Sequence, residues 1–318
     1  MRPSDVDIPE TLRWAAHSFN VDQVTAEVTT AFDTASIDSI LLKGPAIATW
    51  LYSGDQPRLY TDTDLLVQKR DWDRAKDVML ELGFQDDLGP LEHPRMESGE
   101  GHPWCRPDGA EVDLHYALFG IGASPERLWK TFSSGAARER IGGAEVSMPS
   151  RPARLLHISL HAVQHGGERQ LKPMRDLERA LDKASNATWV EAHRLAESLE
   201  ADRSFAAGLR LLPKGRDLAD AIGATQGHST DTALRLAQVP LAEGFQELAD
   251  SPGLRNKAAL VVREVFPKRA FMRWWSPLAR RGRLSLALAY LGRPFWLVLH
   301  APRGLRAWRS SRRGTHQR

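Results

Sequence analysis

Two aspartates carry the clearest chemical signal in the sequence. Asp62 and Asp64 lie two positions apart in residues 59–67, whose apolar and threonine content predicts a strand. Side chains alternate between the faces of a strand, so both carboxylates would project from the same side. Parallel carboxylates repel each other unless a cation lies between them, and Mg²⁺ prefers such oxygen ligands. The spacing therefore indicates a metal site, although the same pattern also occurs on solvated strand faces.

A second acidic segment follows later in the chain. The alternation of residues 110–116 predicts another strand, with Glu111, Asp113 and His115 on one face. If the two strands are neighbours, Asp113 supplies a third carboxylate that closes the site. We expect Glu111 and His115 to surround these ligands.

The elements that must position these residues can be read from the flanking sequence. Residues 39–43 form a short apolar run that ends at Gly44, which is typical of a buried strand. Pro45 then begins a helix that extends to about residue 52. Residues 70–82 predict a charged amphipathic helix. The order strand, helix, strand, helix indicates an α/β or α+β body that ends near residue 149.

The rest of the chain reads as helical. Apolar residues recur every three or four positions in the segments 154–165, 173–183, 188–199 and 203–212. We therefore divide the chain into N-terminal helices (1–38), an α/β domain (39–150), a helical domain (151–264) and a basic amphipathic tail, partly disordered (265–318).

The motifs and their order resemble the nucleotidyltransferase superfamily, which includes DNA polymerase beta and the kanamycin nucleotidyltransferases. In that superfamily an apolar strand ends in glycine and a helix follows; a strand with Asp-x-Asp and a later carboxylate complete the site. Residues 41–44, 62–67 and Asp113 look like these parts. These motifs most resemble those of the branch labelled uncharacterised or family-5 nucleotidyltransferases. In that branch an arginine, here Arg58, precedes Asp-x-Asp, and a histidine, here His115, follows the last carboxylate by two positions. The resemblance covers about residues 40–185.

The resemblance implies an α+β fold: a small nucleotidyltransferase-like mixed sheet flanked by helices, then a helical domain and a basic, Trp-containing helical tail. It also implies two-metal transfer of a nucleoside monophosphate from a nucleoside triphosphate, such as ATP, to a hydroxyl. Asp62, Asp64 and Asp113 would be the catalytic and metal-binding residues, and the ions would be Mg²⁺ or Mn²⁺. Paired ions of this kind stabilise both the attacking and the leaving oxygen.

Three further residues are expected to bind the nucleotide. Gly44 would let the backbone approach the phosphates, and Lys43 or Arg58 could bind phosphate oxygens. The sequence departs from the superfamily at Pro45, because many members have a serine there and proline has neither a hydroxyl nor an amide proton. Lys43 and Arg58 could equally be ordinary surface charges.

Three histidines lie on one face of the predicted helix 154–165. His157, His161 and His165 are spaced four residues apart, and histidines at this spacing can bind zinc. Packing between helices explains the spacing equally well. From the resemblance we expect His161, His165 and Asp176 to lie near the nucleotide or the acceptor, around the metal ligands.

Charge is divided unevenly along the chain. Of the 43 Lys and Arg residues, 13 lie in residues 265–318, which contain no Asp or Glu. The other 30, with all 40 acidic residues, give the first 264 residues a net charge of −10. This separation indicates a neutral-to-acidic body and a segment directed at a polyanion.

The basic tail has three interpretations. It contains tryptophans and a leucine-rich stretch (residues 284–299) that Arg293 and Pro294 interrupt, so an uninterrupted membrane span is not expected. The stretch could pack on the helical domain, with only the basic end loose. It could lie on an anionic membrane surface, or it could bind nucleic acid or an acidic protein.

Composition excludes several classes of protein. With 42% hydrophobic residues, the chain can bury a sizeable core and is neither disordered nor collagen-like. The single cysteine, Cys105, cannot form an intrachain disulfide or a four-cysteine zinc site. The acidic N-terminal residues do not form a secretory signal, and we expect a cytoplasmic protein, or one peripheral to the inner face of the membrane.

Three functions follow from these observations. The first is a metal-dependent nucleotidyltransferase that modifies a hydroxyl of a small molecule, a peptide or a protein. The second is a catalytically silent protein of the same fold that acts as a binding or regulatory module. The third is an RNA-directed nucleotidyltransferase that uses the basic tail, which the acidic body disfavours.

Overall fold

The computed structural model describes residues 10–52, 57–86, 99–165, 171–225, 227, 230–237, 239 and 241–316. The chain divides into two compact units. Of the described residues, the first unit contains those within Met1–Leu88, Arg95–His157 and Glu178–Glu200, and the second contains those within Ile158–Leu177 and Ala201–Arg318. Each unit is described by itself below.

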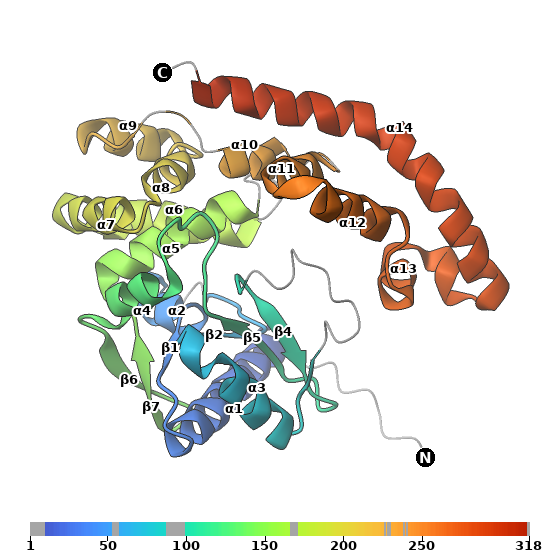
Figure 1. Ribbon diagram of the computed structural model, residues 1–318. Helices are drawn as coiled ribbons and strands as arrows, with labels where there is room; N and C mark the ends of the chain where they lie inside the picture. Colours follow the sequence, from blue (N-terminus) through green and yellow to red (C-terminus); the bar gives the residue numbers. More distant parts are fainter. Residues whose placement is uncertain are drawn as a thin grey trace, which may run out of the picture. The chain divides into compact units, whose positions relative to one another are not determined.

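A five-stranded mixed sheet forms the centre of the first unit (Figure 1). Its spatial order is β1 (Ser39–Leu41), β2 (Thr63–Val67), β5 (Glu111–His115), β4 (His102–Cys105) and β3 (Gln85–Asp86). Strands β2 and β5 are parallel, whereas the other neighbouring pairs are antiparallel. The small mixed sheet expected from the sequence is therefore confirmed.

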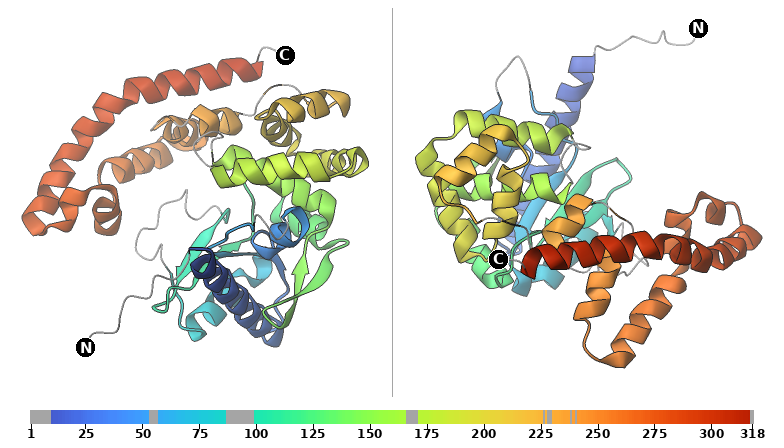
Figure 2. Two further views of the ribbon diagram at one scale, coloured as in Figure 1. Left: turned by 180° about the vertical axis from the view of Figure 1, so that it is seen from behind. Right: turned by 90° about the horizontal axis from the view of Figure 1, so that it is seen from above.

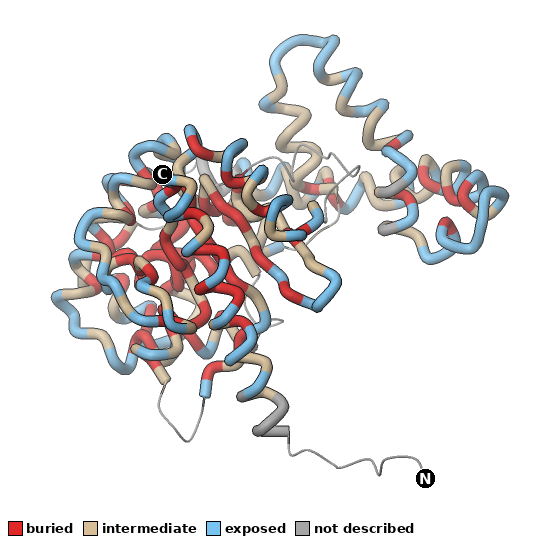
Figure 3. Tube along the Cα trace, turned by 90° about the horizontal axis from the view of Figure 1, so that it is seen from below, coloured by how far each residue is buried: buried red, intermediate tan, exposed pale blue. Residues whose placement is uncertain are grey.

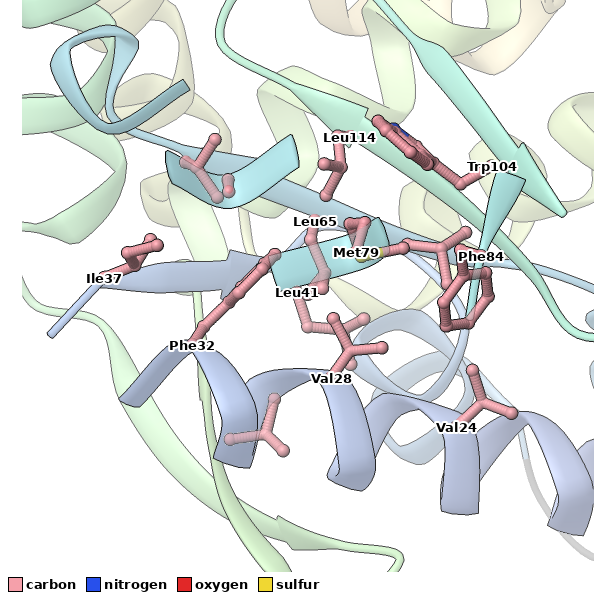
Figure 4. Close-up of a cluster of buried hydrophobic side chains, with 14 of the residues drawn as sticks. Val24, Val28, Phe32, Ile37, Leu41, Leu65, Met79, Phe84, Trp104 and Leu114 are labelled. Carbon is pink, nitrogen blue, oxygen red and sulfur yellow. The ribbon is translucent and has the colours of Figure 1, made fainter. Parts of the chain in front are cut away.

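One face of the sheet packs on two helices. In α1 (Glu10–Thr34), Val24, Val28 and Phe32 recur at helical spacing and lie against Leu65 and other buried side chains (Figure 4). Helix α3 (Trp72–Glu81), which follows the short helix η1 (Lys69–Asp71), adds buried residues to the same core. Each fully buried Leu or Phe contributes about 1.5–3 kcal/mol to folding. Because α1 and α3 cover this face of the sheet, only the opposite face stays open to other residues.

Strand β2 is shorter than the sequence predicts. We expected a strand over residues 59–67, but β2 begins at Thr63, where its pairing with Val112 of β5 also begins. The preceding segment is held by other contacts: the hydroxyl of Tyr60 donates to Oδ1 of Asp22 in α1 at 2.9 Å. Asp62 therefore lies in a bend before the strand, and only Asp64 of the pair is on the strand itself.

A hairpin of β6 (Ala137–Ile141) and β7 (Ala144–Met148) packs beside α1. Its two-residue turn consists of Gly142 and Gly143, with φ of 56° and 97°. Positive φ at both central residues is what a type I′ turn requires. A Cβ added to Gly142 would overlap the backbone carbonyl of Asp22, so this glycine also permits the close approach of α1.

Three more of the described helices lie wholly in the first unit. They are α2 (Pro45–Leu51), α4 (Pro125–Ser133) and α7 (Asn186–Ser198), and the side chains of Ser124 and Ser185 cap the last two. Helices α5 (Arg151–Gln164) and α6 (Leu171–Lys183) carry residues of both units.

The second unit is helical in its described residues. Its helices are α8 (Asp202–Leu209), α9 (Pro213–Ala221), α10 (Thr230–Ala237), α11 (Ala242–Asp250), α12 (Gly253–Val265), α13 (Arg269–Trp275), η4 (Pro277–Arg280) and α14 (Arg283–His316). The helices predicted over residues 154–165, 173–183, 188–199 and 203–212 correspond to α5 through α8. Along these helices buried residues recur among intermediate and exposed ones, and Figure 3 gives the burial class of each described residue along the trace.

The two glycines of the hairpin turn allow a matched test of packing. Gly143→Ala should cost about 1–2 kcal/mol, because an alanine with positive φ is strained but has open space around it. Gly142→Ala should cost about 1–3 kcal/mol more, because its new methyl group also meets the Asp22 carbonyl. Urea denaturation of both variants measures the difference, and equal losses would contradict the close contact.

Candidate active site

The strand register places two carboxylates side by side. Asp64 of β2 and Asp113 of β5 are direct partners across the parallel pair. They project from the face opposite Leu65 and Leu114, which lie in the core under α1 and α3. The two acidic strands are neighbours, which the sequence left open as a condition for Asp113 to join the site. Asp64 is only 1% exposed, whereas Asp113 is partly accessible.

Asp64 is held by a lysine and a histidine. The Nζ atom of Lys43 lies 2.6 Å from Oδ1 of Asp64, and Nε2 of His115 lies 3.2 Å from the same oxygen. Lys43 comes two residues after β1, where the amide of Leu42 donates to the Asp64 carbonyl at 2.9 Å. The backbone and the side chain of Asp64 are therefore both fixed by the segment that follows β1.

These contacts set the ionisation of the site. Burial alone would raise the pKa of Asp64, but Lys43 and His115 outweigh it and hold that pKa well below its usual range. Burial would likewise lower the pKa of Lys43, yet the neighbouring carboxylate raises it. No ion pair joins Asp113 to a cation in the part of the chain that the structure describes, and burial together with the charge of Asp64 raises its pKa to about 6. The pair is thus one stable carboxylate beside one that is costly to ionise.

Asp64, Asp113 and His115 form a cluster that could hold a metal ion. One donor atom from each lies within 4.8 Å of the other two. Carboxylate oxygens suit Mg²⁺ and Mn²⁺, and an added imidazole nitrogen is also acceptable to Mn²⁺ and Zn²⁺. A divalent cation would offset the repulsion that raises the pKa of Asp113. The donor set therefore fits a metal, with Lys43 as the competing cation on Asp64.

Gly44 makes the turn that directs the chain from Lys43 into α2. Its backbone has φ 61° and ψ −122°, a conformation that is open to glycine but strained for other residues. A Cβ here would meet only ordinary contacts with the Tyr60 ring at 3.6 Å. Conformation rather than space therefore requires glycine at this position.

The other predicted ligands lie around the cluster or outside it. Asp62, in the bend before β2, is not part of the metal-ligating group among the described residues, but its charge raises the pKa of Lys43 and Asp113. Arg58 is buried, and its charge acts on Tyr60. Glu111 is exposed at the start of β5. His115, which we expected beside the ligands, contacts Asp64 directly.

His157, which the sequence indicates only as part of the histidine face, lies near the charges of Lys43 and Asp64. It is buried in α5, and burial followed by the charge of Lys43 lowers its pKa to about 3. One turn earlier, Arg154 donates to the Ala46 carbonyl at 2.8 Å, which ties α5 to α2. The four-residue histidine spacing was the available signal, but it does not say which histidine faces the carboxylates.

His161, His165 and Asp176 belong to the second unit. The rings of His161 and His165 meet edge to face with their centroids 4.5 Å apart, and Asp176 is buried. Their expected place around the nucleotide stays a prediction.

Removing the lysine should expose its role as the counter-ion of Asp64. Lys43→Met leaves a buried carboxylate without its cation, so we expect a loss of about 3–5 kcal/mol in the free energy of unfolding. Added Mg²⁺ or Mn²⁺ should restore part of this stability, and should stabilise the variant more than the wild type. Thermal unfolding with and without metal measures both effects.

The matched control is Lys76→Met, which breaks an exposed ion pair with Asp73 in α3. Such a pair is worth less than about 1 kcal/mol, so its loss should change little. Equal destabilisation by both substitutions, or a metal effect of the same size in every protein, would contradict the role of Lys43.

The pKa of His157 makes stability depend on pH. Because this pKa is about 3 in the folded chain against an ordinary 6.5, the unfolded chain binds more protons between those values. The free energy of unfolding should therefore fall as the pH drops through that range. His157→Gln removes this contribution and should flatten the curve, as denaturation above pH 6.5 and again within the range will test. An unchanged slope would show that His157 protonates freely in the folded protein.

Comparison with known proteins places the chain in a family. A model of the family described as "Uncharacterised nucleotidyltransferase" matches residues 10–214, more than half of the chain. No curated protein matches the sequence.

Solved structures to which the chain is similar include three proteins. One is the antibiotic-resistance factor ANT(2'')-Ia (16% identity, TM-score 0.41, covering 61% of this chain and 96% of that one). The second is the lincosamide antibiotic adenylyltransferase LnuA (12%, 0.34, 50% and 94%). The third is an antigenic nucleotidyltransferase-like protein from Paracoccidioides brasiliensis (20%, 0.38, 66% and 94%). By the match of its family model, the chain belongs to the uncharacterised nucleotidyltransferase family.

Proposed function

We propose that the protein transfers a nucleoside monophosphate from a nucleoside triphosphate to a hydroxyl group of a small molecule, a peptide or a protein. The observation that carries the proposal is the register of Asp64 opposite Asp113 on parallel strands, in a chain of a nucleotidyltransferase family. Two carboxylates that share one face, one of them almost fully buried, are costly to maintain and suit a site that binds cations.

The proposed reaction forms one bond to phosphorus and breaks another. The acceptor oxygen forms a bond to the α-phosphorus, and the bond between that phosphorus and the oxygen bridging to the β-phosphate breaks. Pyrophosphate leaves with the bonding electrons. The proton of the acceptor hydroxyl goes to a base, and Asp113 is the candidate because it is the more accessible carboxylate of the pair.

Asp62, Asp64 and Asp113 would hold the divalent ions, Mg²⁺ or Mn²⁺. Bound ions of this kind neutralise charge on the phosphates and on the attacking and leaving oxygens. Asp64 is the fixed member of the set, because His115 orients its carboxylate. Asp62 stands before the strand, close enough to influence the pKa of Asp113.

Lys43 and Arg58 are the candidate phosphate-binding cations. The Nζ atom of Lys43 contacts Asp64, so a modest change of its side chain would bring it to a phosphate oxygen of a nucleotide bound at the pair. Arg58 is buried in the segment just before Asp62. The Gly44 turn fixes the backbone between Lys43 and α2 and so controls where the lysine can reach.

Two observations favour the catalytically silent alternative. The ion pair between Lys43 and Asp64 compensates the buried carboxylate without any metal, and Pro45 offers no hydroxyl or amide proton to a phosphate. A protein of this fold that has lost catalysis would be expected to keep such a pair. The RNA-directed alternative gains no support from the acidic body.

Calorimetric titration with each nucleoside triphosphate separates these functions. We expect Mg²⁺-dependent binding of at least one nucleotide by the wild type. Asp64→Asn and Asp113→Asn should weaken it on the order of a hundredfold, because each removes one metal-ligating charge. Asp73→Asn on the exposed side of α3 is the matched control and should bind as the wild type does.

The same variants then serve in an assay of pyrophosphate release with candidate hydroxyl acceptors. Metal-dependent nucleotide binding without release by any acceptor class would favour the silent module. Failure of the folded wild type to bind any nucleotide in the presence of metal would contradict the proposal.

A further inference from the structure

The last helix presents an apolar face to solvent. In α14, Leu284, Leu288, Leu291, Phe295, Val298 and Leu299 are between 58% and 84% exposed. Their spacing of three and four residues puts them on one side of the helix, here called the exposed face of α14. Single exposed leucines are ordinary on a protein surface, but a continuous row of this length indicates a surface that binds something.

The opposite side of α14 is firmly packed. Leu286 and Ala289 are buried against residues of α13 and η4. Arg293, which is 3% exposed, donates to the Glu264 carbonyl at 2.6 Å and to its carboxylate at 3.1 Å. The hydroxyl of Tyr290 donates to the Pro267 carbonyl at 2.6 Å. The exposed face is therefore the outer side of a helix that already has its protein partners.

Basic charge continues along the same face. Helix α14 contains seven arginines and no acidic residue. Arg303, Arg306 and Arg309 are exposed, and the last two continue the spacing of the apolar row beyond Leu299. One face thus begins with aliphatic side chains and ends with guanidinium groups that no acidic residue of its own helix balances.

By length and composition, residues 283–312 could cross a membrane, with a mean hydropathy of 1.2 in the apolar window. A span would, however, bring Arg293 and Pro294 into the hydrocarbon and break the pair with Glu264. A helix that lies in the interface keeps this pair and buries only its outer face. We propose that the exposed face of α14 binds the surface of an anionic membrane, with α14 parallel to the bilayer plane.

Two other occupants fit the face less well. Single-stranded nucleic acid is bound by a series of stacking rings, but the exposed face as defined contains one ring, that of Phe295, beside five aliphatic side chains. Trp296 stacks on His300 and contacts Trp275, and Trp308 donates to Gln246 of α11. A second copy of the chain would oppose arginines to arginines if the helices were parallel. If they were antiparallel, arginines would oppose leucines. An anionic membrane offers apolar contact to the leucines of the face and negative charge to its arginines.

Sedimentation of the full chain with lipid vesicles tests the proposal. We expect binding to phosphatidylcholine vesicles that contain about one-third phosphatidylglycerol, and little binding to phosphatidylcholine alone. Arg303→Ala/Arg306→Ala/Arg309→Ala should weaken binding on the order of a hundredfold at low salt. Leu288→Asp/Phe295→Asp should weaken it at least about tenfold.

Leu254→Asp is the matched control, since Leu254 of α12 is 87% exposed but lies outside α14. It should bind vesicles as the wild type does, and circular dichroism should show that all variants are folded. No binding to the anionic vesicles by the wild type would overturn the proposal. So would a loss in the arginine variant alone, which would indicate only general electrostatic attraction.

Two parallel measurements distinguish the other occupants. Binding of poly(U) RNA that the arginine variant loses and the Leu288/Phe295 variant keeps, without vesicle binding, would assign the face to nucleic acid. A dimer in analytical ultracentrifugation that the Leu288/Phe295 variant dissociates would assign it to a second copy. The membrane proposal does not depend on the nucleotidyl-transfer reaction, and failure of one leaves the other standing.

Discussion

The burial of the Asp64 carboxylate is the constraint around which the first unit is built. A charge that is 1% exposed costs several kcal/mol unless a partner compensates it, and here Lys43 and His115 both contact one of its oxygens. That arrangement requires β5 beside β2 in the observed register, because Asp113 is then the direct partner of Asp64 and His115 lies on the same face. It also requires the glycine turn at Gly44, which leads the chain from Lys43 into α2. The core beneath α1 and α3 holds the strands in this register.

Much of this site follows from sequence periodicity. The two-residue period placed Asp113 and His115 on one face, but it left open whether their strand would neighbour the first acidic strand. The start of β2 could not be read in the same way, because residues 59–62 look like a strand but pair with no described strand of the sheet. Asp62 consequently lies before the strand. The contact of Lys43 with Asp64 and the burial of His157 depend on tertiary packing, which no spacing along the chain encodes.

The uneven distribution of charge along the chain separates the two surfaces that we propose to bind ligands. The acidic body carries the carboxylate site, whereas the last helix carries seven arginines and no acidic residue of its own. Figure 2 shows α14 as one long helix in both views. The three- and four-residue spacing of its leucines is visible in the sequence, but the spacing alone equally allows burial of that row. Only the packing of Arg293 and Tyr290 shows which side of the helix faces inward.

The most direct test of the central claim is a crystal structure of the protein with Mn²⁺ and a non-hydrolysable nucleoside triphosphate. Anomalous scattering would locate the manganese ions independently of any assumption about their protein ligands. Our account predicts a manganese peak between the carboxylates of Asp64 and Asp113, with Lys43 turned from Asp64 to the triphosphate. A structure in which Lys43 still contacts Asp64 and no manganese lies between the two carboxylates, at saturating metal and nucleotide, would contradict it.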